Sequence, residues 1–196
     1  MIIATTTEQG TNEDTEAASR VTRSIADNYL RRPSIEDRAV HMLATMANND
    51  LSMISQRDEE PSRCDGAYVF VNHNKARFLT AGDSVAYHFV GGELDHRSDE
   101  GVADSFGIGP RYEPNIGPIF ELQLAENAFL TASGSLAAAV SDEAICEALR
   151  ASGTPENWME QLTLLAGPET QFCAVATFLP VKKHSRLRAL ISRVTR

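Results

Sequence analysis

The sequence has few cysteines, and their number and spacing exclude two kinds of small protein. Three cysteines occur in 196 residues, an odd number with no C-x-x-C pair, so neither a disulfide framework nor a zinc knuckle is indicated. The sequence also lacks any run near the roughly 20 apolar residues that a membrane span needs, and its N-terminus does not have the basic-then-apolar form of a signal peptide. These absences predict a soluble, cytoplasmic protein.

Several catalytic signatures are missing as well. The sequence contains no Walker phosphate-binding loop and no G-x-G-x-x-G fingerprint. The Ser-Gly-Ser of residues 133–135 lacks the flanking glycines and the strand-to-helix elbow of a hydrolase nucleophile. The five histidines show no spacing typical of a metal site, and each is interpreted as a surface or packed side chain: His41, His73, His88, His96 and His184.

The length of the chain and its charge distribution indicate one acidic domain followed by a basic C-terminal tail. A chain of 196 residues that is 42% hydrophobic and 23% charged is long enough to bury a core. The last fifteen residues hold six of the 18 basic side chains and no acidic ones, which leaves 12 basic against 27 acidic side chains before them. An acidic body argues against nucleic-acid binding, because such binding depends on neutralising phosphates. We predict a domain over residues 1–181 and a basic tail or helix over residues 182–196.

The basic tail has two interpretations. Its apolar residues recur at helical spacing: Leu187, Leu190, Ile191 and Val194. The preferred interpretation is a helix that packs this apolar face and leaves its charges in solvent. The alternative is an amphipathic segment that contacts an anionic membrane or an acidic partner.

Two amphipathic helices are predicted in the N-terminal third. The first spans residues 12–31 and the second follows Ser34, which is spaced from Asp37 as in a capping box. Both place apolar residues on one face: Ala18, Val21, Ile25 and Tyr29 in the first, and Val40, Leu43, Ala47, Leu51 and Ile54 in the second. Three methionines beside the second stripe are interpreted as core residues in preference to a binding groove: Met42, Met46 and Met53.

The rest of the sequence is predicted to be β-rich and then mixed. Alternating strands are expected at residues 67–71, 75–81 and 85–90, and a Gly-, Asp- and Pro-rich segment follows at residues 95–118. Residues 120–149 indicate strand, turn, strand, loop and helix, with Ser141 as the N-cap of that helix. Thr154 and Pro155 begin a further helix that carries Trp158, Leu162 and Leu165 inward, and a closing strand is expected at residues 172–179.

Four short segments resemble motifs of the metal-dependent PPM (PP2C-type) serine/threonine phosphatases. Residues 133–136 read Ser-Gly-Ser-Leu where the family has Ser-Asp-Gly-Leu, and residues 141–145 read Ser-Asp-Glu-Ala-Ile at the next helix start. Gly82-Asp83-Ser84 with Tyr87 matches a family motif between two strands, and Ala18-Ser19 matches a helix motif. The resemblance implies an α+β, four-layer α/β/β/α sandwich of two antiparallel sheets, here N-terminally trimmed because the first family strands precede the start of this chain.

The resemblance also implies where a metal site would lie. The family holds two divalent cations, Mn²⁺ or Mg²⁺, with several carboxylates, and three of those ligand positions fall on Thr7, Gly134 and Thr170. Asp83 is retained, and Glu8 and Glu169 each lie one residue from a lost ligand. We therefore expect no metal cofactor and a catalytically inactive, phosphatase-like module that binds or regulates a protein partner. The alternative is a divergent Mn²⁺- or Mg²⁺-dependent phosphoprotein phosphatase rebuilt around Asp83, Glu8 and Glu169.

Overall fold

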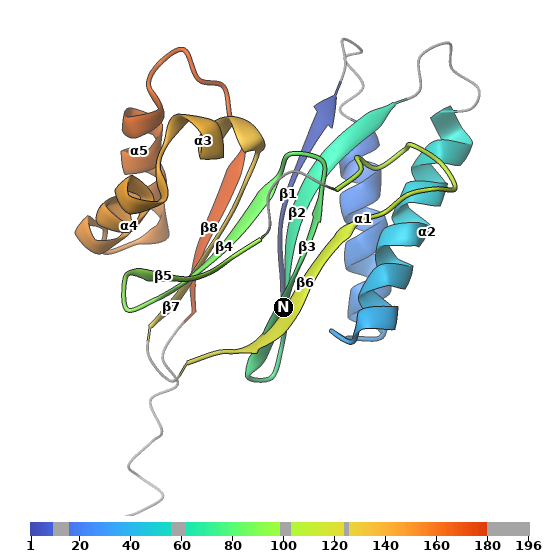
Figure 1. Cartoon of the computed structure of the whole chain (residues 1–196), viewed down its shortest axis with the longest axis horizontal. Coiled ribbons are helices and arrows are strands. Elements are labelled where there is room, and N and C mark those ends of the chain that lie inside the picture. The colour runs from blue at the N-terminus through green and yellow to red at the C-terminus, as the bar shows by residue number, and fades with distance from the viewer. Residues whose placement is uncertain (10–15, 56–61, 99–102, 124–125, 180–196) are drawn as a thin grey trace, which may run out of the picture.

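The structure is a computed structural model that describes residues 1–9, 16–55, 62–98, 103–123 and 126–179. Two helices lie side by side at one end of the molecule as drawn in Figure 1: α1 (Glu16–Arg31) and α2 (Asp37–Ser55). Three shorter helices lie at the opposite end: α3 (Gly134–Ala139), α4 (Asp142–Ala151) and α5 (Pro155–Ala166). The predicted tail at residues 182–196 and the start of the first predicted helix lie outside the described residues.

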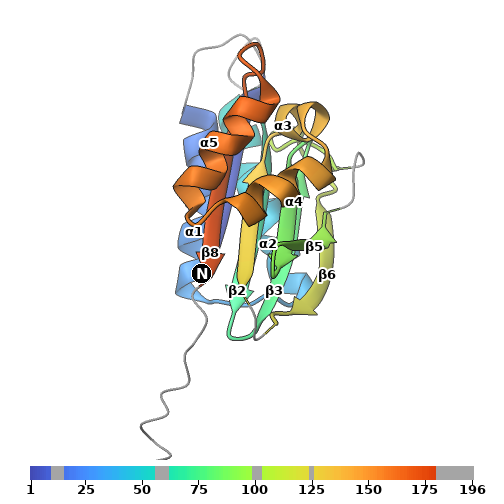
Figure 2. The same cartoon turned by 90° about the vertical axis from the view of Figure 1, so that its left-hand side faces the viewer.

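Two four-stranded sheets fill the space between these helix layers (Figures 1 and 2). The first sheet has the order β1 (Ile2–Gln9), β2 (Arg63–Asn72), β3 (Lys75–Ala81), β6 (Asn115–Glu121). The second has the order β5 (Glu93–Arg97), β4 (Val85–Val90), β7 (Asn127–Ala132), β8 (Ala174–Leu179). Every neighbouring pair in both sheets is antiparallel. The predicted four-layer α/β/β/α sandwich is therefore confirmed.

Three apolar clusters hold the four layers together. One joins α1 and α2 to the first sheet and includes Ile25 and Phe70, and one joins the second sheet to α4 and α5 around Trp158. The third lies between the sheets and includes Phe78 and Phe129. Strands that are buried on both faces, such as β2 and β3, supply side chains to two clusters, which is why their apolar runs are nearly continuous.

The predicted caps of two helices are confirmed. The Ser141 hydroxyl accepts a hydrogen bond from the Ala144 amide at 3.3 Å at the start of α4. The Thr154 hydroxyl accepts one from the Asn157 amide at 3.2 Å, and Pro155 occupies the first turn of α5. Each cap satisfies an amide that has no partner within its own helix.

The predicted strand–turn–strand of residues 120–131 is wrong in its pairing. β6 pairs with β3 in the first sheet, whereas β7 pairs with β4 and β8 in the second. The chain therefore crosses between the sheets here and forms no hairpin. Two elements were also missed: β5 occupies part of the segment expected to be irregular, and α3 begins at Gly134 where a loop was expected. Both are short, and short elements carry too few residues for a periodic signal.

The interpretation of the three α2 methionines as core residues is wrong. Met42, Met46 and Met53 are 55%, 39% and 70% exposed. The face of α2 that meets the sheet is already filled by other residues: Val40, Leu43, Ala44, Ala47 and Leu51. Leu165, expected to point inward from α5, is likewise 49% exposed. Among the described residues, the helices are too short or too polar to cross a membrane.

Candidate functional site

A cavity of about 460 Å³ opens at one edge of the sandwich. It lies where the β3–β4 turn, the start of β2, the junction of β7 with α3 and the approach to β8 meet, at the upper end of the sheets in Figure 1. Eight residues line it: Asp65, Asp83, Ser133, Gly134, Ser135, Gln171, Phe172 and Cys173. This cavity therefore brings together Asp83, Gly134 and the residue that follows Thr170, which are far apart in the sequence.

Two carboxylates lie in the cavity, and their surroundings differ. Asp65 is buried near the start of β2, where its Oδ1 accepts a hydrogen bond from the Ser105 hydroxyl at 2.6 Å and its Oδ2 accepts one from the Asp83 amide at 3.3 Å. Asp65 Oδ2 thus holds the β3–β4 turn, in which Gly82 has a φ of +60°, and Oδ1 holds Ser105 of the segment before β6. Asp83 is exposed to solvent, whereas its neighbour Ser84 is buried. Asp83 is the carboxylate available to a ligand.

The serines of the cavity join α3 to the strand that closes the second sheet. The Ser135 hydroxyl donates to the carbonyl of Gln171 at 2.8 Å and lies 2.9 Å from the Ser133 hydroxyl. Because Ser135 uses its single proton on Gln171, Ser133 must donate to Ser135, and it accepts from the Cys173 amide at 3.2 Å. Both hydroxyl protons are therefore committed to the fold, which is an arrangement for structure and not for nucleophilic attack.

The other predicted ligand positions lie at or beside this edge. Thr7 and Glu8 are in β1, with backbones paired opposite Asp65 and Cys64 respectively. The Thr170 hydroxyl donates to the carbonyl of Ala166 at 2.7 Å, so it is occupied by the end of α5. Glu169 is exposed and is not among the residues that line the cavity.

Asp65 was not among the predicted site residues. Its only sequence signal is a charged residue at the start of a strand that is otherwise apolar, flanked by Cys64 and Gly66. A buried carboxylate in such a position needs hydrogen-bond donors. Those donors, Ser105 and the Asp83 amide, come from other segments, so the sequence alone does not reveal the contact.

The described residues do not fit a two-cation centre of the PPM type. Such a centre needs oxygen ligands in number, and the described carboxylates of the cavity are Asp65, whose oxygens are hydrogen bonded within the protein, and Asp83. Gly134, where the sequence resemblance predicts a substituted ligand position, also has no room for a side chain. A Cβ there would lie 2.7 Å from the Asp83 carbonyl oxygen and 2.8 Å from the Asp83 Cβ.

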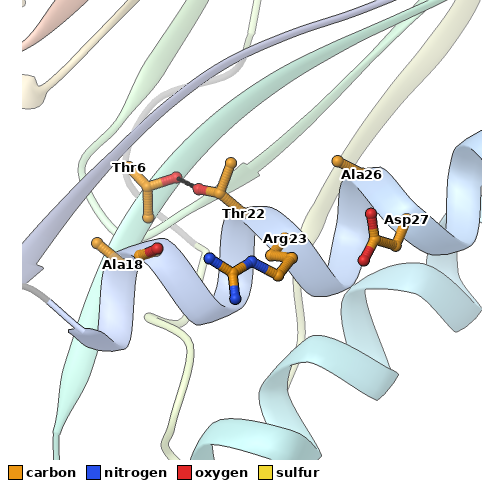
Figure 3. A pocket seen from close by; sticks show the side chains of 7 residues that line it. Thr6, Ala18, Thr22, Arg23, Ala26 and Asp27 are labelled. Carbon is orange, nitrogen blue, oxygen red and sulfur yellow. Dashed lines mark hydrogen bonds between the residues drawn. The ribbon is translucent and has the colours of Figure 1, made fainter.

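A second cavity, of about 480 Å³, lies on α1 beside the end of β1 (Figure 3). The Thr6 hydroxyl lies 2.6 Å from that of Thr22 and 2.9 Å from that of Tyr68, so the three form one hydrogen-bonded group. Burial raises the pKa of Tyr68, which keeps the phenol neutral. Arg23 and Asp27 are exposed on successive turns of α1. These contacts tie α1 to the first sheet and supply no paired acid or base.

Comparison with known proteins gives likenesses in structure alone. No family model matches the sequence, and no curated protein does so either. Among solved structures, a bacterial serine phosphatase is 17% identical with a TM-score of 0.77, covering 93% of this chain and 87% of that one. The catalytic domain of the serine/threonine phosphatase PstP in complex with two manganese ions is 20% identical with a TM-score of 0.71, covering 91% and 88%.

A third similar structure belongs to a phosphatase whose class is given. The PPM Ser-Thr phosphatase MsPP from Mycobacterium smegmatis, in complex with cacodylate, is 16% identical with a TM-score of 0.69, covering 89% of this chain and 86% of that one. The two antiparallel sheets between helical layers are therefore the PPM phosphatase fold. The fold is shared along nearly the whole chain, whereas the chemistry at the sandwich edge must be argued from the residues present there.

Proposed function

We propose that this chain is a catalytically inactive, PPM-fold protein of the cytoplasm that binds or regulates a protein partner. The observation that carries the proposal is the crowding of Gly134 against Asp83, at a position that the sequence resemblance assigns to a metal ligand. The internal hydrogen bonds of Asp65 support it, because they leave Asp83 as the available described carboxylate. One of the structurally similar proteins has a regulatory role: PppA is a key regulatory component of T6SS in Pseudomonas aeruginosa.

The first prediction concerns hydrolysis of p-nitrophenyl phosphate. With Mn²⁺ or Mg²⁺ added, the rate is expected to equal the rate with a chelator, because the described carboxylates are too few to hold two cations. The measurement is release of p-nitrophenol by the purified full chain and by its Asp83→Ala variant, with equal rates expected for both. Metal-dependent turnover that disappears in the Asp83→Ala variant would refute the proposal.

A second prediction concerns the restored ligand. Gly134→Asp is expected to lower the free energy of unfolding by about 1–3 kcal/mol, the usual cost of overpacking, because its Cβ meets the Asp83 backbone. It is not expected to create Mn²⁺-dependent turnover, since one added carboxylate does not complete the ligand set. Gly153→Asp is the matched control for stability, because a Cβ there meets nothing within 4 Å. Metal-dependent turnover in Gly134→Asp would show that a single substitution had silenced the site.

One observation favours the alternative of a divergent metal-dependent phosphatase. Asp65 and Asp83 converge on one cavity, and a cation that displaced Ser105 from Asp65 would find two carboxylates. The two functions differ in the effect of removing the buried acid. An enzyme loses turnover in Asp65→Asn while Mn²⁺ binding weakens, whereas an inactive binding protein shows no turnover to lose and only a change in stability.

A further inference from the structure

A cluster of two histidines and one aspartate lies on the second sheet, away from the sandwich edge. Asp95 Oδ2 is 3.1 Å from His88 Nδ1 and 2.7 Å from His96 Nδ1. A ligand atom from each of the three residues can be chosen so that all lie within 4.8 Å of one another. His88 comes from β4 and the other two from the edge strand β5. His88 pairs across the sheet with Phe129, four residues before Ser133 of the sandwich-edge cavity and thus about 13 Å along β7.

A β-bulge produces this arrangement. Neighbouring residues of a strand normally point to opposite faces of a sheet. Here His88 pairs with His96 and Phe89 pairs with Leu94, so Asp95 is the extra residue between two successive pairs. A bulge re-aims the side chain of its extra residue, which explains how Asp95 and His96 both reach His88.

The hydrogen bonds around His88 determine which of its nitrogens carries the proton. Asn127 Nδ2 donates to the Gln123 carbonyl at 2.9 Å, which turns Asn127 Oδ1 toward His88 Nε2, also at 2.9 Å. Since an amide oxygen only accepts, His88 Nε2 must donate, and the neutral ring has its lone pair on Nδ1.

The lone pair of His88 is buried opposite another acceptor. The side chain of His88 is fully buried, and its Nδ1 has no hydrogen-bond partner of suitable direction among the described residues. Its near neighbour, the Asp95 carboxylate, offers only lone pairs when ionised. Two electron-donating atoms at 3.1 Å repel each other unless a proton or a metal cation lies between them.

Aromatic packing holds both imidazole rings in position. His96 stacks on Phe120 at a centroid distance of 4.2 Å, and His88 lies 5.0 Å from Phe120 and 4.8 Å from Phe129. The side chains of Asp95 and His96 are 32% and 36% exposed, so an ion can enter from solvent. The cluster thus combines a rigid, buried ligand with two accessible ones on an edge strand.

We propose that His88, Asp95 and His96 bind one first-row transition-metal ion of the Zn²⁺ type. Two imidazole nitrogens and one carboxylate suit such an ion, whereas Mg²⁺ and Ca²⁺ prefer oxygen ligands alone. The Asn127 amide holds the His88 ring in the tautomer that a ligand needs, as an outer-shell partner does in known zinc sites. Three protein ligands leave a fourth coordination position for water or for an atom of a bound partner.

The test is a Zn²⁺ titration of the untagged, metal-free full chain, followed by competition with a chromogenic chelator. We expect one equivalent to bind, and we expect both Asp95→Asn and His96→Gln to weaken binding at least ten-fold, since loss of an outer-shell partner alone costs about 10–100-fold. Substitution with Co²⁺ gives a second readout, because its visible absorption reports nitrogen and oxygen ligands directly. Circular dichroism of both variants verifies that each remains folded.

Three control variants separate this cluster from other candidate ligands. His73→Gln removes an exposed turn histidine, Cys173→Ser removes the exposed thiol, and Asp83→Asn removes the carboxylate of the sandwich edge. All three are expected to bind Zn²⁺ as the parent chain does. The proposal is overturned if the parent chain binds no Zn²⁺ at 100 µM, or if His96→Gln and Asp95→Asn bind it as tightly as the parent. Neither result depends on phosphatase activity, so it leaves the proposed function to its own test.

Discussion

Replacing Trp158 with alanine is expected to lower the free energy of unfolding by about 3–5 kcal/mol, the usual cost of truncating a large aromatic core residue. The Trp158 side chain is fully buried in the cluster between α4, α5 and the second sheet. Its ring meets Phe89 edge-on at a centroid distance of 5.3 Å and Phe178 at 6.0 Å. Its indole N–H donates to the Ile145 carbonyl at 3.3 Å, so truncation also leaves a buried acceptor without this partner.

Urea unfolding followed by circular dichroism measures this effect, because Trp158 is the only tryptophan and its fluorescence disappears with the substitution. Leu164→Ala on the same helix is the matched control. The Leu164 side chain is 75% exposed, and its truncation is expected to change stability by less than about 0.5 kcal/mol. A loss below about 1 kcal/mol in Trp158→Ala would mean that α5 contributes little to the cooperative core.

Much of the fold follows from local patterns in the sequence. The stripe of α2 contains enough turns for helical spacing to identify its buried face. The strands β2 and β3 are joined by a short turn, so their antiparallel pairing follows from chain connectivity. The caps of α4 and α5 are decided by neighbouring residues alone, and both are as predicted. These features depend on interactions within a few residues of each other.

Features that depend on distant contacts were not predictable in the same way. Whether β6 pairs with β7 or crosses to the other sheet is decided by which faces are already covered, and no local pattern records that. The methionines of α2 are apolar, yet the contact face had no space left for them.

The side-chain contacts of the two candidate sites were likewise not predictable from local patterns. Asp65 reaches Asp83 only through the pairing of the first sheet and the β3–β4 turn. His88 and His96 are eight positions apart in the sequence, and they face each other with Asp95 because of a bulge whose position the sequence does not mark. Motifs placed Gly134 near Asp83 correctly, but they did not indicate how little space separates them.

The β3–β4 turn of the candidate site is the subject of the remaining prediction. Gly82→Ala is expected to lower the free energy of unfolding by about 2–5 kcal/mol, combining the cost of a left-handed conformation with that of overpacking. Gly82 has a φ of +60°, and a Cβ there would overlap the Asp65 carboxylate. That carboxylate cannot move away without losing its hydrogen bonds to Ser105 and to the Asp83 amide.

Two matched variants separate the causes in thermal or urea unfolding. Gly91→Ala has nearly the same φ, +59°, but its Cβ meets nothing within 4 Å, so it reports the conformational cost alone, about 1–2 kcal/mol. In an Asp65→Ala background the overlap is gone, and Gly82→Ala is then expected to cost no more than Gly91→Ala. A double-mutant cycle measures this coupling, expected to be at least about 1 kcal/mol for residues in contact.

If Gly82→Ala and Gly91→Ala lower the free energy of unfolding of the parent chain equally, the Asp65 side chain moves away from the new Cβ without cost. Its oxygens would then be available to a cation, and that result would favour the divergent phosphatase over the inactive binding protein.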